Sequence, residues 1–201
     1  GSLKSHNDLS LEVLNRFGTV VEYAGISRSQ LLKEVVDTDI LLCNKTVIDS
    51  EVMSAGNTLK YVGLFATGFN NIDIATAKEK GIVVANAGSY STNAVAQQTI
   101  AYILNHYTKI SEYDSFVKEG GWQKATVFSP LVYATDEVYG KTIGLIGYGS
   151  IAKAVEKIAV AIGMRVLVYT RTVSENDPKF VSYDYLLQHS DVVSVHCPLN
   201  Q

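Results

Sequence analysis

A short apolar strand that runs into a glycine-rich turn constrains this chain more than any other feature. Residues 140–152 are read as a strand, a turn and the start of a helix, in which Gly147, Gly149 and Ala152 follow the pattern G-x-G-x-x-G/A. The first small residue permits a tight turn, and the second leaves room for a pyrophosphate to touch the backbone. The third lets a helix pack closely on the strand. We call residues 147–149 the glycine turn.

The sequence around the glycine turn makes the pattern more specific. Gly163 stands where a helix C-cap glycine is expected, and residues 164–169 form a second apolar run. Between them, apolar residues recur at helical spacing: Ile151, Ala152, Val155, Ile158, Ala159 and Ile162. The whole is a βαβ unit of about thirty residues. It predicts dinucleotide binding, and the alternative is a βαβ unit whose glycine turn is unused.

The end of the second apolar run bears on the choice of dinucleotide. NAD-binding units usually carry Asp or Glu there, about twenty residues past the glycines. This chain has Thr170 and Arg171 instead. No carboxylate would repel a 2′-phosphate, and a guanidinium could pair with it bidentately. We therefore favour NADP over NAD. In the alternative, Arg171 is a solvated loop cation beside an adenine ring.

Composition narrows the class of protein. The 201 residues carry a net charge of −3, so no basic surface predicts nucleic-acid binding. No apolar run approaches the roughly 18 residues that span a bilayer, and no signal peptide is visible. Cys43 and Cys197 each end an apolar run, which predicts neither a disulfide framework nor a metal site. We expect a cytoplasmic protein without a metal.

The first half of the chain alternates apolar runs with helical patterns. Apolar runs that lack polar alternation suit a parallel sheet covered by helices. The patterns predict strands at 19–23, 39–43, 59–65 and 82–85, and helices at 9–17, 29–36, 49–55 and 73–80. Residues 1–90 are therefore expected to form a second α/β domain, distinct from the dinucleotide-binding one.

Ligands of such sheets lie beyond the carboxyl ends of the strands, where three loops qualify. The loop 44–46 carries Lys45, which either meets a carboxylate or is simply solvated. The loop 66–71 could hold a small anion on its backbone N–H groups, in the manner of a helix N-terminus. Otherwise it is an ordinary glycine turn that caps the next helix. The third loop is 86–89.

A long helical pattern follows these loops. Apolar residues spaced three or four apart predict one helix from about Ser91 to Glu119, which Gly120 and Gly121 would stop. At 1.5 Å per residue it would be about 40 Å long, enough to join two domains. We expect residues 91–121 to be a hinge helix and 122–201 the NAD(P)-binding domain. Residues 122–139, the arm, have no clear period and are expected to be exposed.

Four motifs stand in order along the chain: residues 63–73, residues 81–86, residues 90–97, and the glycine turn with residues 196–199 after it. Together they resemble the D-isomer-specific 2-hydroxyacid dehydrogenases, most closely the glycerate dehydrogenase or hydroxypyruvate reductase branch. The resemblance implies an α/β fold of two Rossmann-like parallel-sheet domains joined by a long hinge helix. It also implies hydride transfer between NAD(P)H and a small 2-keto or 2-hydroxy acid, in a homodimer.

The resemblance also assigns roles to individual residues. The loop with Thr67 and Gly68 would hold the substrate carboxylate. The residues for the cofactor would be Gly147, Gly149, Ser150 and Ile151, with Thr170 and Arg171 near the adenosine and His196, Cys197 and Pro198 closing over it. His196 is therefore not the expected catalytic acid.

The catalytic Arg, acidic residue and His of the resembled family fall beyond Gln201. We therefore expect the C-terminal part to be absent. The chain as given would be a fragment that binds cofactor poorly and catalyses nothing.

Two other functions fit parts of this pattern. One is a non-catalytic protein that senses NAD(P) on the same scaffold, which the missing C-terminal residues would discriminate. The other is a different Rossmann enzyme, such as a homocysteine-forming hydrolase. The loop 66–68 and the stretch 90–97 argue against the hydrolase.

Overall fold

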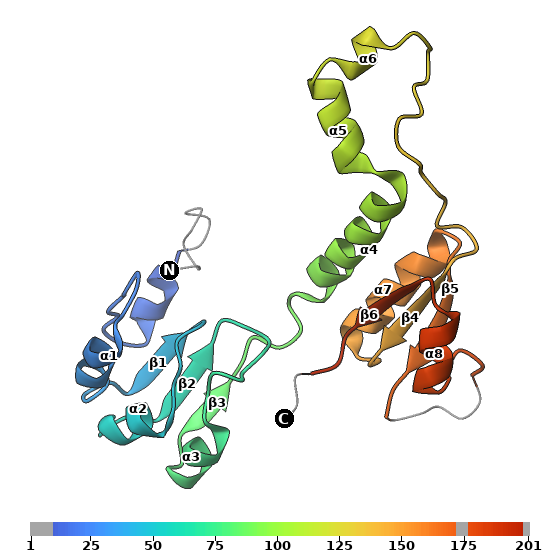
Figure 1. Cartoon of the computed structure of the whole chain (residues 1–201). Helices are drawn as coiled ribbons and strands as arrows, with labels where there is room; N and C mark the ends of the chain where they lie inside the picture. The colour runs from blue at the N-terminus through green and yellow to red at the C-terminus, as the bar shows by residue number, and fades with distance from the viewer. Residues whose placement is uncertain (1–9, 172–176, 199–201) are drawn as a thin grey trace. The chain divides into compact units, whose positions relative to one another are not determined.

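The computed structural model describes residues 10–171 and 177–198, so Leu199 of the fourth motif lies outside the described residues. The chain divides into two compact units, Gly1–Tyr90 and Ser91–Gln201. Figure 1 shows both, each built around its own parallel sheet.

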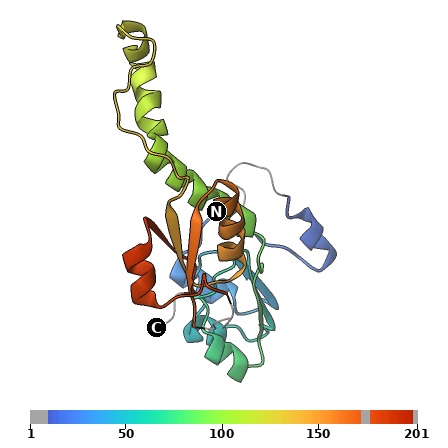
Figure 2. The same ribbon diagram turned by 90° about the vertical axis from the view of Figure 1, so that its right-hand side faces the viewer.

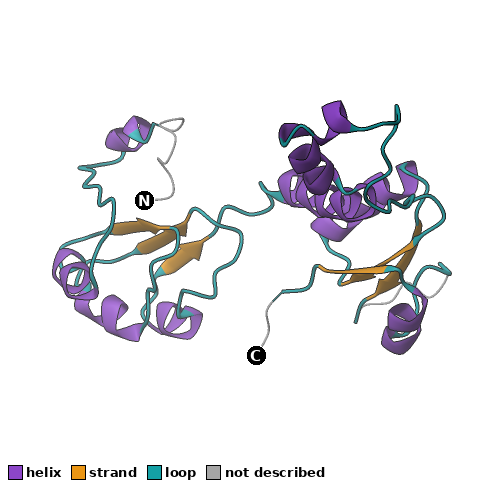
Figure 3. Cartoon of the chain, turned by 45° about the horizontal axis from the view of Figure 1, so that its top comes forward, coloured by secondary structure: helices purple, strands orange, loops and turns teal. Residues whose placement is uncertain are grey.

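The first unit is a three-stranded parallel sheet with helices on one face (Figure 3). Its strand order is β1-β2-β3, and Leu42 lies opposite Gly63 in the register. The core between sheet and helices contains Ile48, Val52 and Val62, none of which is exposed. The elements are β1 (Ile40–Cys43), β2 (Tyr61–Leu64), β3 (Val83–Ala85), α1 (Arg28–Glu34), α2 (Ser50–Ala55) and α3 (Ile74–Glu79).

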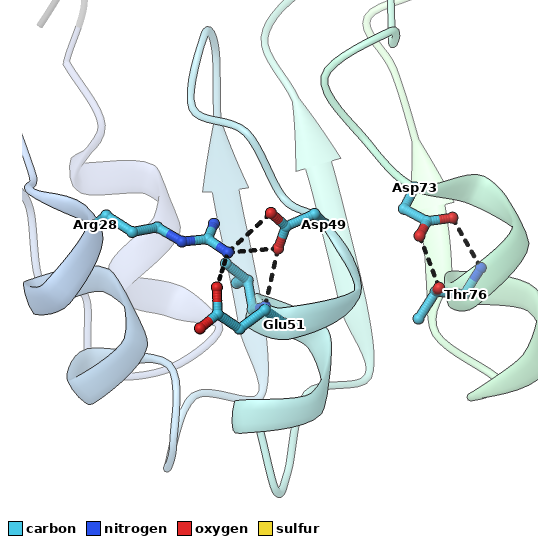
Figure 4. A network of polar contacts seen from close by, with 6 residues as sticks. Arg28, Asp49, Glu51, Asp73 and Thr76 are labelled. Atoms are coloured by element: carbon cyan, nitrogen blue, oxygen red, sulfur yellow. Dashed lines mark hydrogen bonds and ion pairs between the residues drawn. The ribbon is translucent and has the colours of Figure 1, made fainter.

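Acidic side chains start two of these helices. The Asp49 carboxylate accepts from the N–H of Val52 at 3.2 Å, at the N-terminus of α2. Arg28 on α1 donates to Asp49 at 2.7 Å and lowers the pKa of that carboxyl group (Figure 4). Asp73 caps α3 in the same way, accepting from the N–H of Thr76 at 3.0 Å. These caps fix where the helices leave the preceding loops.

The N-terminal residues differ from the predicted pattern. The helix expected at 9–17 is a short 3₁₀ turn, η2 (Glu12–Arg16). The strand expected at 19–23 is wrong: within the described chain these residues pair with no strand. Val21 is 66% exposed, so its side chain lacks the covering layer that a buried strand has.

The second unit holds the predicted βαβ element. Its strand order is β5-β4-β6, all parallel. Core residues of α4 and α7 pack with Ile143 and Leu145 on one face, while α8 covers the other. A Cβ at Gly144 would lie 2.5 Å from Leu186 of α8, so glycine allows that helix its close approach. The elements are α4 (Thr92–Thr108), α5 (Ile110–Lys118), α6 (Gly121–Lys124), β4 (Thr142–Ile146), α7 (Ser150–Ala161), β5 (Arg165–Tyr169), α8 (Tyr183–His189) and β6 (Val192–Val195).

The single helix expected at 91–119 is wrong, because the chain breaks it at Lys109. This residue is left-handed, with φ 55° and ψ 40°, and separates α4 from α5. The Asn105 side chain stabilises the break by accepting from both the N–H and the hydroxyl of Ser111 at 3.0 Å. Ile100 and Ile103 of α4 belong to the core of the second unit. Helix α4 therefore belongs to the second compact unit, Ser91–Gln201.

From the far end of α5, the arm leads back toward the start of β4, as the yellow-to-gold segment of Figure 2. It carries exposed apolar side chains, among them Phe128 at 91% and Leu131 at 86%. The Tyr113 hydroxyl of α5 holds the arm against this helix by donating to the carbonyl of Tyr133 at 3.0 Å. The exposure expected for these residues is confirmed.

Glycine at position 109 tests the break in the helix. A left-handed conformation costs an L-residue about 1–2 kcal/mol, whereas glycine adopts it freely but loses about 0.5–1 kcal/mol of chain entropy. We expect Lys109→Gly to leave the free energy of unfolding unchanged or raise it by up to about 1 kcal/mol. Denaturant titration measures it. The control Ala101→Gly, at an exposed position inside α4, should lower it by about 1 kcal/mol. An equal loss at position 109 would contradict the break.

Candidate functional site

The glycine turn lies at the carboxyl end of β4, the central strand of its sheet. β5 pairs on one side of β4 and β6 on the other, so the strand order reverses here. The Gly147 N–H donates to the carbonyl of Tyr169 at 2.8 Å, and the His196 N–H donates to the carbonyl of Ile146 at 2.7 Å. Ligands of open α/β sheets bind at such a switch point.

Any side chain at position 147 would strain the backbone of this structure. Its φ is +87°, and a Cβ there would lie 2.8 Å from the backbone nitrogen of Cys197. The same Cβ would lie 2.9 Å from the carbonyl carbon of His196. Neither backbone atom can yield without moving the end of β6. Glycine therefore serves both the left-handed turn and the close passage of a second chain segment.

Gly149 is glycine for another reason. It is the N-cap of α7 with φ −86°, a conformation open to any residue, and a Cβ there would meet no atom within 4 Å. The N-caps of α1, α2, α3 and α8 each accept a hydrogen bond through their own side chain, whereas α7, like α4, α5 and α6, has no such cap. At α7 the uncapped N-terminus lies at the switch point of the sheet, where the helix dipole favours an anion on the N–H groups of Ser150 and Ile151.

Ala152 provides the close packing that the third small residue was expected to give. Its side chain is fully buried, as are those of Val155 and Ala159 one and two turns further along α7. The predicted C-cap is confirmed as well: α7 ends at Ala161, and Gly163 has φ +82°.

Two segments flank the glycine turn at the same edge of the sheet. Thr170 and Arg171 follow β5 directly, and Arg171 is exposed. His196, Cys197 and Pro198 follow β6. The His196 imidazole is half-buried, and this burial lowers its pKa, so the ring is neutral at pH 7. Its Nε2 lies 2.9 Å from the Ser194 hydroxyl.

Sequence reasoning missed a polar cluster around Tyr148, the residue between the two glycines of the turn. Lys179 donates to the Glu156 carboxylate at 2.7 Å and to the Tyr148 hydroxyl at 2.9 Å. The only signal in the sequence is that Tyr148 and Glu156 lie eight residues apart across the start of a helix. Nothing in the sequence links Lys179 to them.

In the first unit, the three expected loops are hydrogen-bonded to one another at the carboxyl edge of the sheet. The Asn71 side chain donates to the carbonyl of Thr46 at 2.7 Å. The Asn86 side chain donates to the carbonyl of Thr67, and the Thr67 hydroxyl donates to the carbonyl of Gly88, both at 2.7 Å. The loops that carry Lys45, Thr67 and Gly68 are therefore neighbours.

The N-terminus of α3 does not serve as the anion site considered for the loop 66–71. Asp73 already fills it with its own carboxylate, which accepts from Thr76 through both oxygens. Any anion at this edge would meet the loop backbone instead. Lys45, Thr67 and Gly68 are all exposed there.

The described residues contain neither a cluster of metal ligands nor a membrane-spanning helix. Over residues 10–171 and 177–198, no three His, Cys, Asp or Glu side chains are grouped so that they could hold a metal ion. Among the helices of the same residues, none has the length and apolar character needed to cross a membrane.

Known proteins share both sequence and fold with this chain. Residues 100–201 match the family model described as D-isomer specific 2-hydroxyacid dehydrogenase, NAD binding domain. Hydroxypyruvate reductase of Blautia hydrogenotrophica is 37% identical over 96% of the chain, which spans 62% of that relative. Glyoxylate reductase of Thermococcus onnurineus is 37% identical over 88% of the chain, which spans 55% of it.

A solved structure extends the similarity. An acyclic imino acid reductase in complex with NADPH and D-Arg superposes with a TM-score of 0.80 at 29% identity, covering 94% of this chain and 61% of that one. The parallel sheet, the glycine turn and the family match over half of the chain agree. The chain belongs to the D-isomer-specific 2-hydroxyacid dehydrogenase family.

Proposed function

We propose that this chain is part of an enzyme that reduces a small 2-keto acid, such as hydroxypyruvate or glyoxylate, with NAD(P)H. The observation that carries the proposal is the uncapped N-terminus of α7 behind a glycine turn at the switch point of the sheet. A Cβ at Gly149 would stand in open space, so the turn has room for a diphosphate. The names of the reductases to which the chain is similar support the substrate class.

In this proposal each unit has a separate task. Gly149, Ser150 and Ile151 hold the cofactor diphosphate on backbone N–H groups. Gly147, whose own N–H is bound to Tyr169, shapes the turn beside them, and residues 196–198 lie against the adenosine side. Bound there, the nicotinamide supplies the hydride for the carbonyl carbon. Lys45, Thr67 and Gly68 hold the carboxylate of the keto acid by charge and backbone hydrogen bonds.

We further propose that the dinucleotide is NADP and that the protein is a homodimer. NADP is favoured over NAD because Thr170 and Arg171 follow β5 where a carboxylate would select NAD. Similar solved structures contain either NADPH or NAD, so the preference rests on these two residues alone. A homodimer would cover the exposed apolar side chains of the arm, such as Phe128 and Leu131.

Two glycine variants test the cofactor site. Gly149→Ala should leave the free energy of unfolding unchanged or raise it by about 0.4–1 kcal/mol, because its φ suits alanine. Its Kd for NADPH should rise by roughly tenfold or more, since the methyl group occupies the diphosphate space. The matched variant Gly147→Ala should lower stability by about 1–3 kcal/mol through backbone strain. Calorimetry that finds wild-type affinity in Gly149→Ala would contradict the site.

Arg171 tests the cofactor preference. A hydrogen bond to a charged group contributes about 1.5–3 kcal/mol, so Arg171→Ala should raise the KM for NADPH by roughly 10- to 100-fold. The KM for NADH should not change. Steady-state kinetics of the full-length protein with both cofactors measure this difference. A wild-type KM lower for NADH than for NADPH would reject the preference.

The reaction itself is tested by oxidation of NADPH and NADH with the full-length polypeptide. Hydroxypyruvate, glyoxylate, pyruvate and phosphohydroxypyruvate are offered in turn, and absorbance of the reduced cofactor is followed. We expect turnover with hydroxypyruvate or glyoxylate. Cofactor binding with no turnover on any of the four acids would favour the sensing protein over the enzyme.

A further inference from the structure

Tyr148 is the only residue with a side chain in the glycine turn, and three residues from two segments of the second unit hold it. Its ring meets the ring of Phe180 edge-on, with 5.3 Å between centroids. Its hydroxyl donates to the Glu156 carboxylate on α7 and accepts from Lys179 at 2.9 Å. Burial, with the Glu156 hydrogen bond, raises the pKa of Tyr148, so the hydroxyl keeps its proton at neutral pH.

Lys179 is itself fixed by the backbone. The carbonyl of Lys179 accepts from the N–H of Val168 in β5 at 2.7 Å, and the N–H of Val181 donates back to Val168 at 2.9 Å. Phe180 forms a parallel bridge with the same strand residue. The Lys179 side chain therefore extends from the edge of the sheet, and its ammonium group contacts both α7 and the glycine turn.

The Lys179–Glu156 pair differs from the other ion pairs of the chain. Its side chains are 24% and 18% exposed, whereas those of the Lys60–Asp39 pair are 79% and 61% exposed. A pair withdrawn from water is screened less and fixes its geometry more firmly than an exposed one. The hydrogen bond to Glu156 also raises the pKa of Lys179, which therefore stays charged.

The two other charged groups beside this cluster balance each other. Asp177 approaches Lys179 at 3.3 Å, and the Lys153 ammonium lies 5.4 Å from the centroid of the Tyr148 ring. With Lys179 and Glu156, the cluster carries two positive and two negative charges. Its effect on a bound anion therefore depends on where it holds the turn rather than on net charge.

The turn needs such support because glycine flanks Tyr148 on both sides. Glycine has the largest conformational freedom of any residue, and that freedom is lost when a ligand fixes the backbone. A side chain anchored at three points restricts the turn before the ligand arrives. Pre-organisation of this kind improves affinity by lowering the cost of ordering.

We propose that Tyr148, Glu156 and Lys179 are positioning residues that hold the glycine turn in the shape that binds a dinucleotide diphosphate. This inference rests on the proposed cofactor site and adds three residues to it. It predicts that loss of any of the three side chains weakens cofactor binding, although none of them contacts the cofactor. An ordering cost of about 0.5–1.5 kcal/mol corresponds to a change in Kd of roughly 3- to 10-fold.

Glu156 gives the sharpest test, because two explanations predict opposite signs. If the cluster acts only through charge, Glu156→Ala removes an anion and tightens NADPH binding. If it positions the turn, Glu156→Ala raises the Kd by roughly 3- to 10-fold. Tyr148→Phe, which changes no charge and keeps the ring on Phe180, should raise it likewise. Calorimetry on the full-length protein measures both variants, and circular dichroism checks that they fold.

Variants of Lys179 test the same role, with Lys157 as the control position. Lys179→Met should weaken NADPH binding, and Lys179→Arg should restore most of it. Lys157→Met makes the same change of charge at an exposed position of α7 and should have no effect. The loss should appear in the KM for NADPH with kcat retained. Adenosine monophosphate, which carries no diphosphate, should bind all variants equally.

The outcomes separate this inference from the proposed function. If the wild-type protein binds neither NADPH nor NADH, the cofactor site itself is wrong. If the wild type binds and the Tyr148, Glu156 and Lys179 variants bind equally well, only the positioning role is wrong. Tighter binding by Glu156→Ala would also overturn it.

Discussion

The second unit depends on one close backbone contact, between Gly147 and the chain that leaves β6. A Cβ at position 147 would lie within 3.0 Å of three backbone atoms of His196 and Cys197. The parallel pairing of β4 with β5 and β6 brings the three strand ends to one edge. A side chain at position 147 would force apart the glycine turn and the chain that leaves β6, and so shift the segment after β6 relative to the start of α7. The absence of a side chain there thus allows the close packing of the candidate cofactor site.

Prediction from sequence succeeded where the physical signal is local. Gly147, Ala152 and Gly163 each meet a demand within one strand–turn–helix unit, and that unit has the predicted form. The prediction failed at Lys109, because the apolar spacing continues through a residue that the Asn105 cap holds left-handed. It also failed at residues 19–23, since a strand requires a partner that an apolar run does not reveal.

In the candidate site, too, local features could be predicted from the sequence and long-range contacts could not. The residues of the glycine turn could be named from the sequence, whereas Lys179 reaches Tyr148 across 31 positions of chain. The hydrogen bonds of Asn71 and Asn86 join loops of the first unit through backbone carbonyls, which carry no sequence signature. Contacts of this kind turn a recognisable motif into a rigid site, and only a structure reveals them.

If the uncapped start of α7 beside Gly147 and Gly149 binds the diphosphate of a nicotinamide dinucleotide, the backbone amides there must respond to the ligand. Amide NMR of the ¹⁵N-labelled full-length protein during titration with NADPH measures this response. We expect the largest shift changes on the N–H groups of Gly149, Ser150 and Ile151, saturating with the rest of the site. Saturable binding that leaves these three amides unchanged, or no binding of either dinucleotide, would contradict it.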